Sequence, residues 1–167
     1  GDKKITEADR KILGSTSPKF IASMVNSISY KGFDFSIFLY ASVGAMLNNN
    51  IEYLNKPGRA NSIVIDYWTP TNPTNAYPRP SVDNASPAYV KSLQYEKADF
   101  IRVRNITLGY TLPEKLLKKI RARKIRVYLS ANNPFVITGF SGIDPEGARG
   151  YTAPSASTWM GGVNLSF

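Results

Sequence analysis

Strict alternation of apolar and polar residues, repeated in segments of about ten residues, is the feature that most constrains how this chain can fold. The clearest example is KIRVYLSAN (124–132), in which apolar residues hold the odd positions and polar residues the even ones. DFSIFLYASVGAML (34–47) and WMGGVNLSF (159–167) alternate in the same way. Because successive side chains of a strand point to opposite faces, each segment is expected to be a β-strand with one apolar face.

An all-β, antiparallel arrangement is therefore expected. Its five predicted strands are 21–30, 34–47, 99–112, 124–132 and 157–167. Residues 34–47 also fit a helical spacing, but the short glycine turn before them and their aromatic content favour a strand. The apolar parity changes within 99–112, which predicts a β-bulge near Arg104 and Asn105. Residues 113–122 are expected to form a short amphipathic helix, because Pro113 and Glu114 suit a helix N-terminus.

The connections between these strands alternate in length. The connection at 31–33 is short, that at 48–98 is long, that at 113–123 is moderate and that at 133–156 is long. In an antiparallel sheet the long connections then share one end, as in outer-membrane β-barrels with long extracellular loops. Ten tilted residues span roughly 24 Å of apolar band. The alternation alone is equally compatible with a soluble β-sandwich. It is the unequal length of the connections at the two ends of the sheet that favours the barrel.

Composition removes several classes of function. The chain has no Cys and no His, which excludes disulfides, thiol nucleophiles, a histidine base and the usual zinc ligands. Nothing in the sequence fixes two carboxylates together, so no enzymatic activity and no cofactor are expected. Asp2, Thr6 and Asp9 have part of a calcium-loop spacing, but Lys3 stands where such loops place Gly, so no metal site is predicted and calcium stays an open alternative.

Several longer motifs resemble one protein family. ADFIRVRNITLGYTLPEKLLKK, followed by IRVYLSANNPFVITGFSGIDPE, resembles the C-terminal barrel region of SusC/RagA-type TonB-dependent transporters of Bacteroidetes outer membranes. Upstream, ITEADRKILGSTSPKF, SYKGFDFSIFLY and WTPTNPTNAYPR are similar to further motifs of that family. The resemblance covers essentially the whole chain.

The resemblance implies an antiparallel transmembrane β-barrel of 22 strands, of which this chain supplies the last five. The plug and the N-terminal strands are absent, and the opening GDKK, without Met, suggests a fragment. The implied function is import of a glycan or peptide across a Gram-negative outer membrane. The implied partners are the rest of the barrel and plug, a SusD-like lipoprotein, the TonB complex and outer-membrane lipid. The alternative is a soluble carbohydrate-binding β-sandwich.

Two candidate sites concern the membrane. The final strand resembles a barrel-assembly signal with alternate apolar residues and a terminal aromatic, namely Trp159, Val163, Leu165 and Phe167. A basic cluster suits anionic headgroups at the membrane interface and comprises Lys115, Lys118, Lys119, Arg121 and Arg123, with Lys124 and Arg126 beyond it. The alternatives are a plain closing strand and a solvated turn. The net charge of +9 alone would suit nucleic acid, but no stacking aromatics lie among these cations, so no nucleic-acid partner is expected.

A third candidate site lies in or beside the long connection 48–98. Tyr67, Trp68 and Tyr95 could bind substrate by stacking on sugar rings. The alternative is that these aromatic residues pack the proline-rich loop against itself or against the partner lipoprotein.

Overall fold

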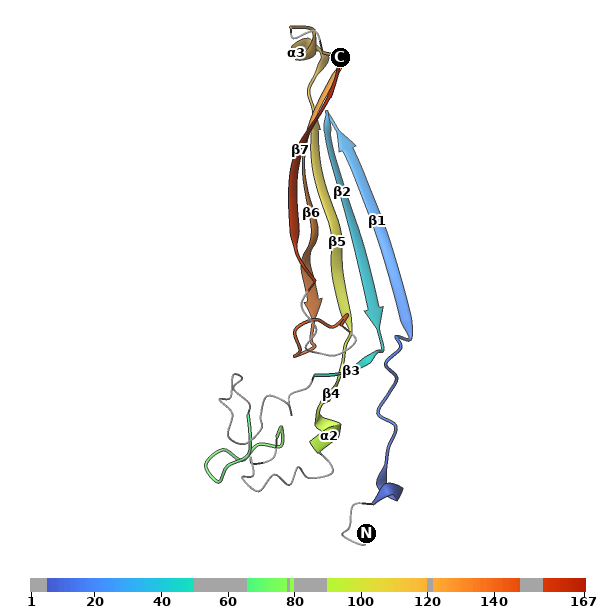
Figure 1. Ribbon diagram of the computed structural model, residues 1–167, viewed down its shortest axis with the longest axis vertical. Helices are drawn as coiled ribbons and strands as arrows, with labels where there is room; N and C mark the ends of the chain where they lie inside the picture. Colours follow the sequence, from blue (N-terminus) through green and yellow to red (C-terminus); the bar gives the residue numbers. More distant parts are fainter. Residues whose placement is uncertain (1–5, 50–65, 78, 80–89, 120–121, 148–154) are drawn as a thin grey trace. The chain divides into compact units, whose positions relative to one another are not determined.

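Figure 1 shows a computed structural model of the 167-residue chain, which describes residues 6–49, 66–77, 79, 90–119, 122–147 and 155–167. The chain divides into two compact units. The strand unit comprises Lys19–Val43, Asp99–Gly139 and Pro154–Phe167. The loop unit comprises Gly1–Pro18, Gly44–Ala98 and Phe140–Ala153.

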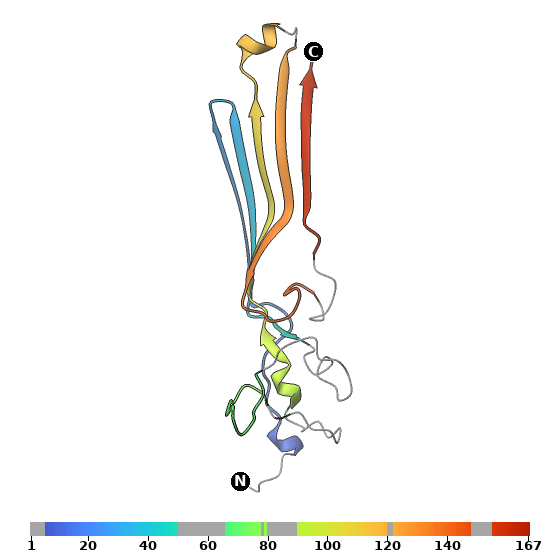
Figure 2. The ribbon, with the colours of Figure 1, turned by 90° about the vertical axis from the view of Figure 1, so that its left-hand side faces the viewer.

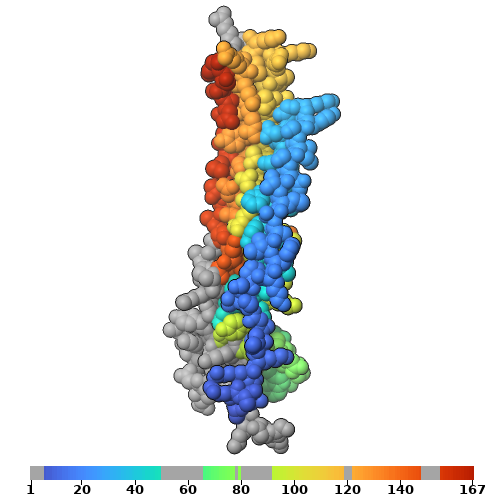
Figure 3. All heavy atoms as spheres, turned by 90° about the vertical axis from the view of Figure 1, so that its right-hand side faces the viewer, coloured from blue at the N-terminus to red at the C-terminus, as the bar shows by residue number. Residues whose placement is uncertain are grey.

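The strand unit is one five-stranded antiparallel sheet in the order β1-β2-β5-β6-β7, which confirms the predicted all-β antiparallel fold. Its strands are β1 (Phe20–Tyr30), β2 (Phe33–Val43), β5 (Phe100–Thr111), β6 (Lys124–Thr138) and β7 (Thr158–Ser166). Figure 2 shows them side by side, and across the face seen in Figure 3 their colours follow the same order from β7 (red) to β1 (blue). A short helix, α3 (Glu114–Lys119), joins β5 to β6.

Two expected boundaries are wrong. The strand predicted over 34–47 stops at Val43, because Gly44 has a φ of +91°, which an extended strand does not adopt. Residues expected as loop after 132 continue β6 to Thr138. Asn133 hides this extension in the sequence, because a polar residue with a φ of 48° interrupts the alternation and is followed by Pro134, although Phe135 and Ile137 keep the odd positions of the apolar face.

The turn between β1 and β2 is a two-residue hairpin. Lys31 and Gly32 both have positive φ, 46° and 88°, which is the backbone of a type I′ turn. The carbonyl of Gly32 also accepts a hydrogen bond from the backbone N–H of Thr111 at 2.7 Å. A Cβ at Gly32 would lie 2.8 Å from the carbonyl oxygen of Thr111, so this position is suited to glycine for two reasons.

The parity change in β5 is a bulge. Against β2, the register passes from Val103 directly to Asn105, which leaves Arg104 as the extra residue of β5. Against β6, two residues, Asn133 and Pro134, stand opposite Arg104, so on that side the extra residue belongs to β6. This matches the bulge predicted near Arg104 and Asn105. Its effect is to send the side chains of both residues toward the same face of the sheet.

The loop unit contains the two-stranded sheet of β3 (Met46–Asn48) and β4 (Tyr95–Lys97). Short helices η1 (Glu7–Asp9) and α2 (Val90–Leu93) also belong to it. Its small apolar core consists of Ala45, Leu47, Ala98 and Phe140. Among the described residues of the chain, no helix is long and apolar enough to cross a membrane.

Candidate functional site

The sheet of the strand unit has one apolar face. Hydrogen-bonded partners place apolar residues beside one another across all five strands, as in the row Ile28, Phe35, Leu108, Leu129 and Gly161. Leu108 and Leu129 are 50% and 51% exposed, so the described residues leave this face largely uncovered. A continuous exposed apolar face of this extent marks an interaction surface, with protein or with lipid.

Every charged side chain of the five strands belongs to the opposite face. These residues are Asp34, Arg102, Arg104, Lys124 and Arg126. The register pairs Asp34 with Gly109, Arg102 with Tyr40 and Lys124 with Ser166. Along each strand these positions alternate with those of the apolar face. Complete separation of charge from the apolar face is the pattern of a strand with lipid on one side and water on the other.

Aromatic residues mark the ends of the apolar face on the two edge strands. Phe20 and Tyr30 begin and end β1, whereas Trp159 lies near the start of β7 and Phe167 directly follows it. Along the hydrogen-bonded rows Trp159 is level with Asn26, not with Phe20. This stagger is what tilted strands require if their aromatic ends are to reach the same two membrane interfaces.

On the polar face, the turn end of the sheet contains an ion pair. Arg126 Nε and one guanidinium NH₂ donate to the two carboxylate oxygens of Asp34 at 2.9 and 2.5 Å. The guanidinium also lies 5.2 Å from the ring centre of Tyr128, which in turn packs over Gly162. A bidentate, half-buried pair of this kind fixes the relative positions of β2 and β6.

Substituting Gly162 with alanine is expected to destabilise the sheet by about 1–3 kcal/mol, because the added Cβ would lie 2.6 Å from the Tyr128 ring. Denaturant unfolding of the full-length protein measures the change. The matched control is Gly161→Ala, whose Cβ would meet only the Tyr128 carbonyl oxygen at 3.9 Å. Adding Tyr128→Leu should relieve the Gly162→Ala defect; equal losses from both glycine variants would contradict this packing.

The predicted assembly residues Trp159, Val163 and Leu165 all point to the apolar face, and each is more than half exposed. Phe167 follows β7 directly and is 76% exposed. β7 pairs with β6 only, which makes it an edge strand among the described residues. The structure therefore brings the four residues onto one edge of one face.

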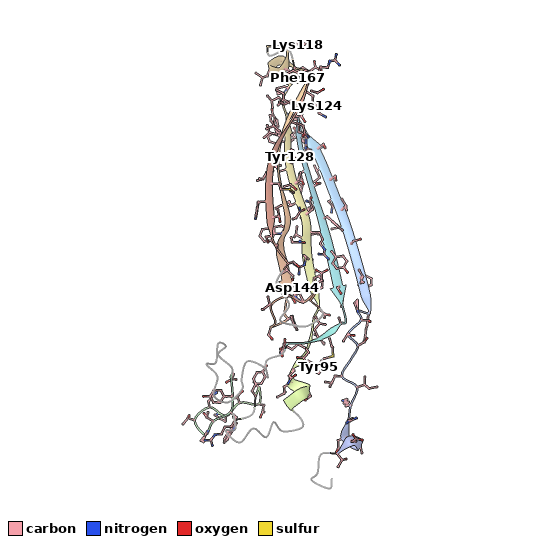
Figure 4. The ribbon with its side chains drawn as sticks, viewed as in Figure 1. Tyr95, Lys118, Lys124, Tyr128, Asp144 and Phe167 are labelled. Atoms are coloured by element: carbon pink, nitrogen blue, oxygen red, sulfur yellow. The ribbon has the colours of Figure 1, made fainter. Side chains whose placement is uncertain are left out.

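The basic residues gather at the turn end of the sheet. Figure 4 shows Lys118 and Lys124 at the same end of the strand unit as Phe167. The backbone N–H of Arg123 donates to the Ser166 carbonyl at 2.8 Å, and the side chain of Leu117 in α3 is buried. Lys115 and Lys118 belong to α3; Arg121 and the side chain of Lys119 lie outside the described residues. Arg126 does not belong to this cluster, since it pairs with Asp34 on the polar face.

Tyr67 and Trp68 occupy a turn held by one carboxylate. Asp66 accepts hydrogen bonds from Asn72 Nδ2 at 2.8 Å and Thr74 Oγ1 at 2.7 Å, and the Trp68 N–H donates to the Tyr77 carbonyl. The hydrogen bond from Thr74, then that from Asn72, lowers the pKa of Asp66 below its ordinary value. The turn presents Tyr67 and Trp68 at 42% and 41% exposure, whereas Tyr95 lies on β4.

This turn is expected to lose its ordered structure at low pH. The ionised carboxylate of Asp66 stabilises the turn, and its pKa in the folded protein is lowered. The stabilisation of the turn is therefore complete above the ordinary aspartate pKa of about 3.9 and is lost as the pH falls through the lower pKa of the folded state. Hydrogen exchange at the Trp68 amide, corrected for the intrinsic rate, should show high protection at neutral pH and loss of protection in stronger acid. Asp66→Ala should show weak protection throughout; an unchanged profile in that variant would contradict the assigned role.

Sequence reasoning missed a polar cluster in the loop unit. Glu96 accepts hydrogen bonds from the Asn49 side chain, from the Ser141 backbone N–H at 3.0 Å and from Ser141 Oγ at 2.6 Å. Asn49 is fully buried. The cluster joins segments far apart in the sequence, and no local motif indicates such a long-range contact.

Within the described ranges, no group of three or more His, Cys, Asp and Glu residues could hold a metal ion. Asp2 lies outside these ranges, and the Asp9 carboxylate accepts a hydrogen bond from the Thr6 backbone N–H at 2.7 Å. The calcium alternative therefore gains no support from the described residues.

The sequence of the chain is similar to those of known TonB-dependent receptors. No family profile matches the chain. The chain is 35% identical over 148 residues to TonB-dependent receptor P3 of Formosa agariphila, covering 87% of this chain and 14% of that protein. It is 30% identical over 178 residues to the TonB-dependent receptor SusC of Bacteroides thetaiotaomicron, covering 100% of this chain and 17% of SusC.

Solved structures of a related importer have a similar fold. The RagAB peptide importer in its open-open state has a TM-score of 0.73 and 27% identity, covering 94% of this chain and 18% of the matched chain. The antiparallel sheet, with one apolar and one polar face, is a segment of an antiparallel transmembrane β-barrel. With the relatives above, the chain belongs to the TonB-dependent receptors of the SusC/RagA type, which are outer-membrane proteins. It spans less than a fifth of the length of these relatives.

Proposed function

We propose that this chain is part of an outer-membrane transporter that imports a nutrient, a glycan or a peptide, in a TonB-dependent way. The observation that carries the proposal is the two-faced sheet, with an exposed apolar face and all of its strand charges on the other face. In this arrangement lipid covers the apolar face, and the polar face lines the path of the cargo. The relatives are named as receptors, so the role is binding and passage without a covalent change.

One proposed partner, the rest of the barrel, follows from the edges of the sheet. Within the described part of the chain, β1 pairs only with β2, and β7 only with β6. Unpaired strand edges are not stable within a bilayer, so the remaining strands of the barrel must continue the sheet on both sides. The plug, a SusD-like lipoprotein and the TonB complex complete the proposed transporter.

Two surfaces of this chain are proposed to contact the membrane system. The basic residues of α3 and of 123–124 would lie at anionic headgroups, beside the exposed side chain of Leu116. The edge strand β7 would be the strand that the barrel-assembly machinery recognises, by pairing with its open backbone groups.

The alternative to the transporter is a soluble β-sandwich that binds carbohydrate. A sandwich needs a second sheet against its apolar face. The described part of the strand unit holds one sheet, and its apolar face is exposed. This observation favours the barrel.

Fractionation and uptake together test the proposal. The full-length protein should partition with the outer membrane and require detergent for extraction, and nutrient uptake should stop when TonB is removed. Recovery in the soluble fraction without detergent would refute the barrel. Uptake that persists without TonB would refute the transport mechanism while leaving the barrel intact.

A further inference from the structure

The long connection between β2 and β5 carries two exposed aromatic side chains on one turn, residues 66–77, here called the Asp66 turn. Tyr67 and Trp68 are 42% and 41% exposed. Among the described residues, neither ring stacks on another ring or on a cation. In outer-membrane barrels the long connections lie outside the cell, where a nutrient first arrives. The two rings are therefore available to a ligand on that side.

Hydrogen bonds hold the backbone of the Asp66 turn. The Asp66 carboxylate accepts from Asn72 Nδ2 at 2.8 Å and from Thr74 Oγ1 at 2.7 Å. Asn72 Nδ2 also donates to the Tyr67 carbonyl at 3.2 Å, and the Asn72 backbone N–H donates to Thr69 Oγ1 at 2.9 Å. Because the backbone beneath the rings is already fixed, little further ordering is needed when a ligand binds to them.

The Asp66 turn is anchored to the rest of the loop unit through Tyr77. The Trp68 N–H donates to the Tyr77 carbonyl at 2.9 Å, and the side chain of Tyr77 is half-buried. Burial, and then the nearby Glu96 carboxylate, raise the pKa of the Tyr77 hydroxyl above its ordinary value. Glu96 belongs to the polar cluster with Asn49 and Ser141. Tyr77 thus holds the turn against this cluster while the two rings stay exposed.

The residues around the two rings are polar and, apart from one carboxylate, neutral. Within 66–77 Asp66 is the only charged residue, and three threonines and two asparagines accompany it. A carboxylate that accepts one hydrogen bond on each oxygen has lone pairs left for further donors, such as sugar hydroxyls. The C–H groups on one face of a sugar ring pack well on the negative face of an aromatic ring. Asp66 also repels an anionic ligand, and the turn has no cation to offset it.

We propose that the Asp66 turn is a binding subsite for a neutral oligosaccharide, in which a sugar ring stacks on Trp68, Tyr67 makes a second contact and Asp66 accepts hydrogen bonds from sugar hydroxyls. This inference rests on the proposed transport function and narrows its cargo to a neutral glycan. Tyr95 is outside this subsite, because successive residues of β4 point to opposite faces and Glu96 is the one near the turn.

The test uses the full-length receptor in lipid nanodiscs without a lipoprotein. The probes are neutral tetrasaccharides of glucose, mannose, galactose and xylose, a uronic-acid tetrasaccharide and a capped tetraalanine peptide. Wild type should bind at least one neutral tetrasaccharide at least about tenfold more tightly than the acidic saccharide or the peptide.

Substitutions then assign that binding to the two rings. Trp68→Ala should weaken it at least about tenfold, and Tyr67→Ala should weaken it severalfold. Trp68→Phe keeps an aromatic face and should retain most of the affinity. Tyr95→Ala is the matched control, because it removes a ring of similar exposure, 43%, from β4 and should leave the affinity unchanged. Hydrogen exchange at the amide of position 68 reports whether the turn stays ordered in each variant.

Wild type that binds none of the neutral saccharides, or that binds the peptide more tightly than all of them, would overturn the inference. Unchanged saccharide affinity in Trp68→Ala would also overturn it, and a loss of lipoprotein binding in that variant would then assign the ring to the protein partner. If Trp68→Ala loses protection at position 68, Tyr67→Ala and Tyr95→Ala decide, and equal effects of these two variants would contradict the subsite.

The proposed function is tested separately. Outer-membrane localisation and TonB-dependent uptake of the natural nutrient are measured in wild type. If both hold while no neutral saccharide binds, the transport function stands and only the saccharide subsite fails.

Discussion

Replacing Ile106 with lysine is expected to destabilise the folded barrel by about 2–4 kcal/mol, the cost of a lysine near the middle of the lipid face. Ile106 is the central apolar-face residue of β5, and its cross-strand partners are Ile37 and Ala131. A lysine there would have to place its ammonium in hydrocarbon or extend far along the strand to reach water. Denaturant unfolding in lipid vesicles measures the loss.

Ser36→Lys is the matched control. Ser36 pairs with Thr107, the neighbour of Ile106, and so lies at nearly the same level on the opposite face. A lysine at this position would face water and should change stability by less than about 1 kcal/mol. Similar losses in the two variants would mean that the two faces do not have different environments.

Replacing Phe167 with aspartate is expected to reduce the amount of receptor in the outer membrane severalfold, because the proposed recognition of β7 requires an apolar side chain at the interface. Phe167 shares the apolar parity of Trp159, Val163 and Leu165 and is 76% exposed. Quantitative blotting of outer-membrane fractions from cells expressing the full-length protein provides the measurement.

Ser166→Asp places the same charge one position earlier, on the polar face opposite Lys124. That variant should reach the membrane at wild-type levels. Wild-type levels of Phe167→Asp would remove the assembly role from this residue, whereas an equal loss in both variants would attribute the effect to charge at the end of the strand.

Much of the sheet could be predicted because its information is local. The parity of 124–132 determines which face each side chain occupies, and the parity change in 99–112 predicts a bulge near Arg104 and Asn105, which the pairing with β2 confirms. Gly32 signals the tight turn because few other residues adopt its conformation. These features depend on residues a few positions apart, which a single sequence displays directly.

The remaining features depend on contacts that the sequence does not display. Asn133 interrupts the alternation, so the sequence predicts a loop for the last residues of β6, which are in fact paired with β5. The Asn49–Glu96–Ser141 cluster joins three distant segments. Neither the Gly162–Tyr128 packing nor the stack of Arg104 on Tyr40 follows from spacing, because both arise from the register between strands.

The central claim is that lipid covers the apolar face and water the polar face. It is tested most directly by placing a nitroxide label at single cysteines along 158–166 of the full-length receptor in bilayers; this chain has no cysteine of its own to compete. Collisions with oxygen, which concentrates in lipid, should peak at Val163 and Leu165. Collisions with a water-soluble nickel chelate should peak at Asn164 and Met160. A profile without this alternation, or with water contact at Val163 equal to that at Asn164, would contradict the claim.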